Sequence, residues 1–299
     1  MNDYRCKSPV ALLVFNRPDE TRVVFEQIRK SAPRRLLVVS DGPRPGVPAD
    51  VENCRRVREL IQEGVDWDCE LLTNYSAAHM GCKLRVSSGL DWVFELNDRA
   101  IVLEDDCVPA MSFFRYCDEL LESFSNDSRI MQICGTNVSQ DTTSKEYSFY
   151  FSKFGPIWGW ASWRRAWKFY DVSMREWPKI VADKIYENFW EFPGEAAFRL
   201  EIYEEVYRGH VDTWDLQWGF TKFINSGLSI VPSKNLIRNI GYGDNATHTK
   251  TTGSPAANLI TEDLEFPLRH FPFVVRKRSV DLDFHNIMTP ARFRGNGPG

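Results

Sequence analysis

Short apolar runs alternate with helix-like patterns over the first hundred residues. Runs typical of strands buried on both faces occupy residues 10–15, 35–40, 69–73 and 100–103. Between them, apolar residues recur at helical spacing, first after Pro18 and last over 83–96. Repeated strand-helix units with buried strands predict right-handed crossovers. We therefore expect an α/β fold with a mostly parallel, Rossmann-like central sheet flanked by helices.

Polar side chains come directly after each predicted strand. They are Asn16-Arg17, Asp41-Gly42, Asn74 and the acidic triplet Glu104-Asp105-Asp106. Ligands of parallel sheets bind beyond the carboxyl ends of the strands, where the following loops meet. The sequence therefore predicts one crevice to which four loops contribute.

The pattern changes after Phe124. A short strand at 129–135 is followed by an aromatic stretch, by helices at about 196–208 and 213–225, and by a strand at 228–232. The aromatic stretch contains four tryptophans within ten residues, namely Trp158, Trp160, Trp163 and Trp167. The i, i+4 spacing of the last two predicts one helical face packed inward.

The composition limits the partners. The 299 residues carry 37 Lys and Arg against 41 Asp and Glu, a net charge of −4, which provides no broad basic surface for nucleic acid. No apolar run approaches a membrane span, and the N-terminal run is too short for a signal peptide. We expect a cytoplasmic protein, with peripheral association at the inner face of a membrane left open. The seven cysteines lack CxxC spacing and are expected to be reduced.

The triplet Glu104-Asp105-Asp106 concentrates negative charge at the end of a buried strand. Adjacent carboxylates repel one another, and burial raises their pKa values unless a cation is present. Mg²⁺ and Mn²⁺ suit carboxylate oxygens and are commonly shared with substrate phosphates. The triplet therefore predicts a site for one of these ions, the alternative being a solvated turn.

Four further residues are candidates for the same site. His248, in a Gly-rich loop, is either a metal ligand through neutral imidazole or a structural histidine. Arg17 and Lys83 are either solvated or offer positive charge to a diphosphate, which the amides of the helix that begins at Lys83 would also favour. Asp41 either accepts a hydrogen bond from a nucleobase or ribose or merely forms a turn.

Tryptophans in loops are candidates for binding the acceptor. Trp158 and Trp160 are interleaved with Gly and Pro, which suits a loop that presents indole faces to a sugar ring, and Trp214 is a third candidate for this platform. The alternative is that these rings belong to the core, as most aromatic clusters do.

The segment VDTWDLQWGF offers a general base. Asp215 lies between Trp214 and Trp218, where partial desolvation would raise its pKa and improve it as a base for a hydroxyl nucleophile. Asp212 is the other candidate base. The structural alternative is that Asp212 and Asp215 cap a helix in a capping-box arrangement.

Taken in order, these motifs resemble the GT-A nucleotide-sugar glycosyltransferases, and specifically a bacterial group of nucleotide-diphospho-sugar transferases. The resemblance runs from about Val10 to Phe273 and rests on LVFNRPDETRVVFEQIRK, VVSDGPR, GCK, LEDDCVP, WGWASWRRAWKFYD, DTWDLQW and GDNATHT. It implies that Asp106 binds the metal, with His248 beside it. It further implies that the residues facing the nucleotide-sugar are Phe15, Asn16, Arg17, Asp41, Lys83, Glu104 and Asp105.

The chain is also similar to the N-acetylglucosaminyltransferase that initiates complex N-glycans, which has an EDD triplet and a later Trp-Asp pair. This likeness implies that Asp215 is the base of an inverting reaction. We further expect a single GT-A domain with a nucleotide-sugar half at 1–135, which ends after the EDD motif, an acceptor and catalytic half at 136–273, and a tail or linker at 274–299.

We therefore expect transfer of a sugar from a nucleoside-diphosphate sugar, most simply a UDP-sugar, to a hydroxyl of a glycan or glycolipid. The first alternative is a sugar-nucleotide pyrophosphorylase, although the loop FNRPDE lacks the glycines of its phosphate loop. The second is a non-catalytic carbohydrate-binding module.

Overall fold

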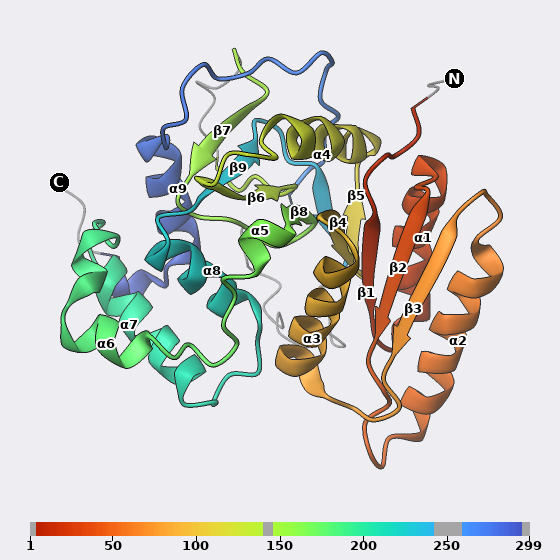
Figure 1. Ribbon diagram of the computed structural model, residues 1–299. Helices are drawn as coiled ribbons and strands as arrows, with labels where there is room; N and C mark the ends of the chain where they lie inside the picture. Colours follow the sequence, from red (N-terminus) through yellow and green to blue (C-terminus); the bar gives the residue numbers. More distant parts are fainter. Residues whose placement is uncertain (1–3, 140–145, 242–258, 295–299) are drawn as a thin grey trace.

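The computed structural model describes residues 4–139, 146–241 and 259–294, and a large mixed sheet runs through it (Figure 1). The eight strands of this sheet lie in the order β3-β2-β1-β4-β8-β6-β9-β7. Their bounds are β1 (Val10–Val14), β2 (Arg35–Ser40), β3 (Glu70–Tyr75), β4 (Arg99–Glu104), β6 (Ile130–Cys134), β7 (Phe149–Ser152), β8 (Trp160–Trp163) and β9 (Leu228–Pro232). A separate antiparallel pair joins β5 (Cys107–Pro109) and β10 (Ile237–Asn239).

Parallel pairing dominates the first half of the sheet. The pairs β1–β2, β2–β3 and β1–β4 are parallel, as is β6–β9 in the second half, whereas β4–β8, β6–β8 and β7–β9 are antiparallel. The expected α/β fold with a mostly parallel central sheet flanked by helices is confirmed. Because β1–β4 and β8–β7 belong to one sheet, the two expected halves share a continuous backbone scaffold.

Helices cover both faces of this sheet (Figure 1). Their bounds are α1 (Pro18–Ser31), α2 (Pro48–Gly64), α3 (Gly81–Leu96), α4 (Met111–Ser123), α5 (Arg164–Trp167), α6 (Trp177–Ala182), α7 (Glu195–Tyr207), α8 (Asp215–Ile224) and α9 (Arg278–Met288), with short 3₁₀ turns at Ile185–Asn188 and Ala291–Phe293. Among the described residues, no helix is long and apolar enough to cross a membrane.

Alternation along the strands divides the core into two layers. Leu12 and Val14 point toward the layer that α1, α2 and α4 cover, and Ala11 and Leu13 point toward the layer that α3, α5 and α8 cover. A third apolar cluster is mostly aromatic and lies among α6, α7 and α8; its buried rings include Trp177, Trp190, Tyr203, Phe220 and Phe223.

Two expectations about secondary structure were wrong. Trp163 ends strand β8 and Trp167 ends the short helix α5, so they do not share a helical face. Both are nevertheless buried, in different layers of the core. Strand β3 is only partly buried, because it is the edge strand of the sheet and has a neighbour on one side only.

The segment expected to be a tail or linker is structured. Residues 274–294 contain α9, in which Asp281 is 0% exposed and His285 is 1% exposed. The Lys277 N–H donates to the Phe151 carbonyl at 2.8 Å, and Arg276 forms a parallel bridge with Phe151 on the outer side of β7. This segment therefore covers the second edge of the sheet.

Candidate active site

The carboxyl ends of β1 and β4 meet at the point where the chain order reverses. The chain passes from β1 outward to β2 and β3, and then returns to the opposite side of β1 as β4. Such switch points leave a crevice between the two loops that follow the central strands. Here those loops are the three residues Phe15–Arg17, between β1 and α1, and Asp105-Asp106, which follow the last β4 residue, Glu104.

Direct contacts join the two loops. The Phe15 N–H donates to Asp105 Oδ2 at 3.1 Å, and the Arg17 guanidinium donates to Asp106 Oδ2 at 2.9 Å. The same Arg17 nitrogen lies 3.7 Å from Asp105 Oδ1. The structure therefore brings Phe15, Arg17, Asp105 and Asp106 together, as the sequence predicted.

The negative charge of the triplet exceeds what Arg17 supplies. Burial, and next the carboxylates of Asp106, Asp105 and Asp215, raise the pKa of Glu104 well above its ordinary value. Burial and Asp106 likewise raise the pKa of Asp105 to about 7, against the opposing effect of Arg17. The Glu104 Oε1 atom is buried and has no hydrogen-bond partner. An additional positive charge would stabilise this arrangement.

The carboxylates of the triplet fit a divalent cation whose remaining ligands come from a substrate. Within the described ranges, no group of three or more His, Cys, Asp or Glu side chains forms a protein-only metal site. Mg²⁺ and Mn²⁺ are often held by one or two carboxylates together with substrate phosphates, and the triplet offers carboxylates of this kind. Gly241 approaches Asp106 so closely that a Cβ there would lie 2.0 Å from Oδ2. His248, the other predicted ligand, lies outside the described residues.

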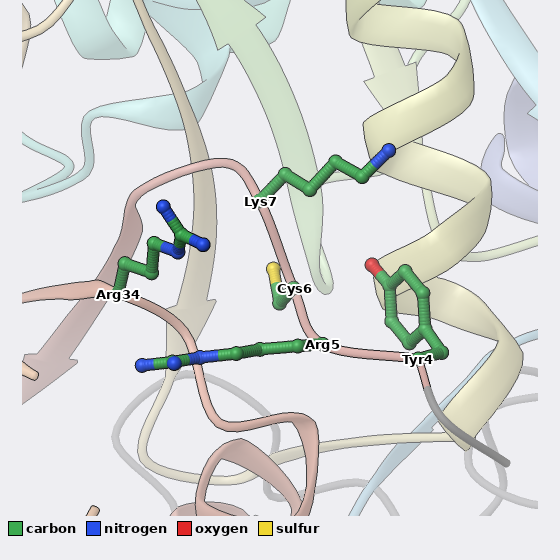
Figure 2. A pocket seen from close by; sticks show the side chains of 5 residues that line it. All are labelled: Tyr4, Arg5, Cys6, Lys7 and Arg34. Carbon is green, nitrogen blue, oxygen red and sulfur yellow. The ribbon is translucent and has the colours of Figure 1, made fainter. Parts of the chain in front are cut away.

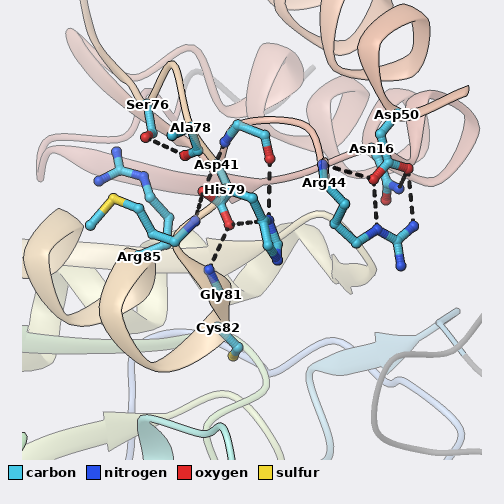
Figure 3. Close-up of polar contacts among 12 residues, drawn as sticks. Asn16, Asp41, Arg44, Asp50, Ser76, Ala78, His79, Gly81, Cys82 and Arg85 are labelled. Carbon is cyan, nitrogen blue, oxygen red and sulfur yellow. Dashed lines mark hydrogen bonds and ion pairs between the residues drawn. The ribbon is translucent and has the colours of Figure 1, made fainter. Parts of the chain in front are cut away.

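Asp41 has a different role from the one expected. Its Oδ1 accepts the N–H groups of Gly42 and Met80, and its Oδ2 accepts the N–H of Gly81 and contacts the His79 ring at 2.9 Å (Figure 3). The residue is 5% exposed. Both oxygens are therefore engaged within the protein, and the expectation of a free acceptor for a nucleobase or ribose is corrected. Asp41 ties the loop after β2 to the start of α3.

Asn16 is also held, by the first turn of α2. Its Nδ2 donates to Asp50 Oδ1 at 2.7 Å, and Asp50 accepts two further side-chain bonds from Arg44, at 2.6 and 3.0 Å (Figure 3). Hydrogen bonding to Arg44 lowers the pKa of Asp50 to about 2. The Phe15 ring lies against His79, with a centroid separation of 5.3 Å. The loop after β1 is thus fixed at each of its three residues.

The N-terminus of α3 already binds a carboxylate. The N–H groups of Cys82 and Lys83 donate to Asp212 at 3.0 and 2.9 Å. The expectation that these amides are available to a diphosphate is therefore corrected. The Lys83 amine has no hydrogen-bond or ion-pair partner in the described part of the chain.

Asp215 is the first residue of α8, and its charge acts on the acidic triplet. Its charge is among those that raise the pKa of Glu104, so the two carboxylates lie within electrostatic range of each other. The Thr213 hydroxyl donates to Asp215 Oδ1, and no described residue donates to Oδ2. The capping-box alternative was wrong, because Asp212 caps α3 and α8 begins without a side-chain cap.

Two of the three platform tryptophans are core residues. Trp160 is 0% exposed and Trp214 is 2% exposed, and their rings stack on each other with a centroid separation of 5.6 Å. The expectation that they present a face to a sugar is corrected, because neighbouring rings cover both of them. Trp158 is partly exposed and stays a candidate.

A hollow of about 520 Å³ lies at the other end of the strands and is shown in Figure 2. It is lined by Tyr4, Arg5, Cys6, Lys7 and Arg34. These residues precede β1 and β2, whereas the acidic triplet lies at the carboxyl end of β4. The hollow is therefore separate from the crevice.

The sequence patterns did not identify two arginines whose side chains hold the loops together. Arg58 donates to the carbonyls of Asp41 and Ser76, and buried Arg85 donates to the carbonyls of Ser40 and Asn74. Both lie within amphipathic helices, where an arginine ordinarily indicates a solvated face. Arg85 lies on the inner side of α3, next to Val86 and Ser87. This position is unusual for a charged residue and is the one sequence feature that indicated a buried arginine.

Neither a protein-family model nor a curated protein matches the chain. One similar solved structure is a UDP-glucose pyrophosphorylase complexed with UDP-glucose, at 10% identity over 57% of this chain and 80% of that chain, with a TM-score of 0.35. Another is the inositol-1-phosphate CTP transferase from T. maritima, at 10% identity over 56% and 75% of the chains, with a TM-score of 0.32. These likenesses concern the backbone only, so the functional argument rests on this chain's own side chains.

Proposed function

We propose that the chain is a metal-dependent glycosyltransferase of the GT-A type, which moves a sugar from a nucleoside-diphosphate sugar to a hydroxyl group. The observation that carries the proposal is the excess of buried carboxylate at the switch point, where Glu104, Asp105 and Asp106 share one guanidinium, that of Arg17. A divalent ion with a bound diphosphate completes such a site chemically.

Each residue then has a defined task. Asp106 would hold the ion, with Asp105 and Glu104 behind it, and the bound ion would offset the charge of the leaving diphosphate. Lys83, with no described partner of its own, would add positive charge. Asp215 would accept the proton of the acceptor hydroxyl at Oδ2, since Oδ1 is held by Thr213. Asp212 is unsuited to this role because both of its oxygens bind α3 amides.

A sugar nucleotidyltransferase is the competing hypothesis, and both similar solved structures bear names of that activity. Such an enzyme needs backbone amides in a glycine-rich loop for a nucleoside triphosphate. Here only Phe15–Arg17 separate β1 from α1, and the Phe15 amide is bound to Asp105. The crevice therefore suits a diphosphate held by a metal better than a triphosphate held by a loop.

The test begins with nucleotide binding. Calorimetry with UDP and Mn²⁺, with and without EDTA, should show binding that requires the metal and is lost in Asp106→Asn. A panel of nucleotide sugars, scored by donor hydrolysis and by transfer to hydroxyl acceptors, then identifies the donor. Asp98→Asn is a matched control, because that side chain is 89% exposed and makes one ion pair.

The base assignment has its own test. Asp215→Asn should lower the transfer rate by about 10²–10⁴-fold while leaving UDP affinity unchanged. Equal transfer by Asp215→Asn and wild type would show that Asp215 is not the base. Synthesis of a nucleotide sugar from UTP and a sugar 1-phosphate would instead establish the nucleotidyltransferase. Glycan binding that needs no nucleotide would establish a binding module.

A further inference from the structure

Asp212 forms a bridge between segments 130 residues apart. It belongs to the loop between α7 and α8, and its two oxygens accept the N–H groups of Cys82 and Lys83 in the first turn of α3. First-turn amides have no partner within their own helix, so this carboxylate satisfies two donors that would otherwise face solvent.

Gly81 makes this approach possible. Its φ of +81° lies in the left-handed region, and a Cβ at this position would lie 2.8 Å from Asp212 Oδ2. Any other residue would be strained at this φ and would push the carboxylate away from the amides. The backbone of α3 is therefore shaped to receive a side chain from the other half of the sheet.

The same short loop leads to Asp215. Trp214, between them, is stacked on Trp160 and accepts a hydrogen bond from the Tyr170 hydroxyl through its carbonyl, at 3.1 Å. Thr213 donates to Asp215. The loop is therefore fixed at Trp214 by the core and at Asp212 by α3, with the Asp215 carboxylate directly after both fixed points.

We propose that Asp212 is a positioning residue, which holds the start of α8 against the start of α3 and thereby sets where Asp215 faces the acidic triplet. This rests on the proposed function, in which Asp215 is the base. Asp212 itself contacts no reacting atom. Because the side chain is exposed, solvent competes for its two bonds, and removal of the carboxylate should not prevent folding.

The alternative is that Asp212 stabilises α3 and nothing else. The two roles differ at the amide of Trp218, which donates to the Trp214 carbonyl at the start of α8, at 3.3 Å. A local cap would leave this amide unaffected. If Asp212 instead positions α8, removal of its carboxylate should weaken the hydrogen bond of the Trp218 amide.

Hydrogen exchange and kinetics of Asp212→Ala test the proposal. We expect exchange at the Cys82 and Lys83 amides to rise roughly two- to thirtyfold, and exchange at Trp218 to rise with it. The transfer kcat should fall roughly ten- to hundredfold, while the KM for the donor stays within about twofold. Asp212→Asn, whose amide oxygen can still accept an N–H, should restore part of each effect.

Asp171→Ala is the matched control. Asp171 also accepts two backbone N–H groups, from Ser173 and Arg175 at 3.0 and 2.9 Å, but within its own loop. It should change neither Trp218 exchange nor kcat. Faster exchange at Cys82 and Lys83 with an unchanged Trp218 amide would overturn the positioning role. Absence of transfer by the wild type would count against the proposed function alone, since exchange still decides the role of Asp212.

Discussion

The two halves of the sheet are held by different kinds of contact. In the first half, charged side chains bind backbone groups of the loops, as Asp41, Arg58 and Arg85 do. In the second half, the helices beyond the sheet pack through rings, for example Trp190 stacked on Tyr203 at 5.6 Å. A hydrogen bond is favourable only when donor and acceptor are correctly oriented. Apolar burial depends on the area removed from water and constrains the orientation of the groups only weakly. The difference indicates that loop geometry is specified most strictly where the candidate donor site lies.

Truncation of a buried ring should give the largest effect. Trp218, on α8, is 0% exposed and packs against Trp160 and Trp167. We expect Trp218→Ala to lower the free energy of unfolding by about 3–5 kcal/mol, because the cavity cannot be refilled. Urea denaturation measures this loss. A loss below about 1 kcal/mol would show that aromatic packing does not dominate the second half.

Removal of Asp41 should give the next largest effect. Asp41→Ala leaves the buried amide of Gly42 and the partly buried amide of Met80 without their acceptor, and we expect a loss of about 2–4 kcal/mol in the free energy of unfolding. Exposed Asp19, which makes one ion pair at 3.7 Å, is the control, and Asp19→Ala should change stability by less than about 0.5 kcal/mol. Equal losses in the two variants would contradict the role of hydrogen bonds in the first half.

The second half also contains a buried cation, Lys222, which should make the free energy of unfolding depend on pH. Lys222 is 1% exposed and donates to Gln132 and Ser229, and it has no acidic partner in the described ranges. Burial lowers its pKa from the ordinary 10.5 to about 8. At this lysine the unfolded chain therefore binds more protons than the folded chain between pH 8 and 10.5, and the contribution of Lys222 to the free energy of unfolding should rise through this window by at most about 3 kcal/mol.

Lys222→Met should abolish this rise and leave stability at pH 7 equal to or above that of the wild type. The Gln132 oxygen keeps its second donor, the Trp218 indole at 3.0 Å. Chemical denaturation at pH 7, 8 and 10 follows both proteins. A stability difference between the two proteins that stays constant from pH 8 to pH 10 would show that Lys222 is not buried as a free cation.

The smallest effect should come from Arg44. Its bonds hold the pKa of Asp50 at about 2, so they contribute stability above the ordinary value of 3.8 that is lost as the pH falls through 2. Arg44 is half exposed, which weakens the pair, and we expect Arg44→Ala to cost about 1 kcal/mol at pH 7. The difference in Tm between variant and wild type should narrow toward pH 2, and a constant difference would argue against the ion pair.

Sequence reasoning was most successful where one physical signal dominated. The runs that became β1, β2 and β4 are apolar because both faces of the sheet are covered, and short uninterrupted apolar runs are typical of such strands. The acidic triplet was found for the same reason, since three charges after a buried strand are costly. Its contacts with the loop of Phe15 and Arg17 followed from strand order.

The errors concern side chains that could act in more than one way. Trp160 follows Gly159 and Trp214 follows Thr213 in the sequence, and only the packing of these rings on each other and on Trp218 shows that they are buried. Asp212 appeared to cap the helix next to it, but it caps one 130 residues away. No local pattern reports which donor a carboxylate will reach, because that depends on how the chain folds back on itself.

The covered edge at β7 has a consequence for association. A sheet has two edge strands, and each exposes hydrogen-bonding groups on which another polypeptide can add a strand. Here β7 is covered by the chain's own residues Arg276 and Lys277, whereas no described residue pairs with the outer side of β3. On β3, the ion pair between Glu70 and Arg35 places charge at the start of the strand. The segment of Arg276 and Lys277 therefore hinders another polypeptide from adding a strand at β7. At β3, the charged side chains disfavour such addition.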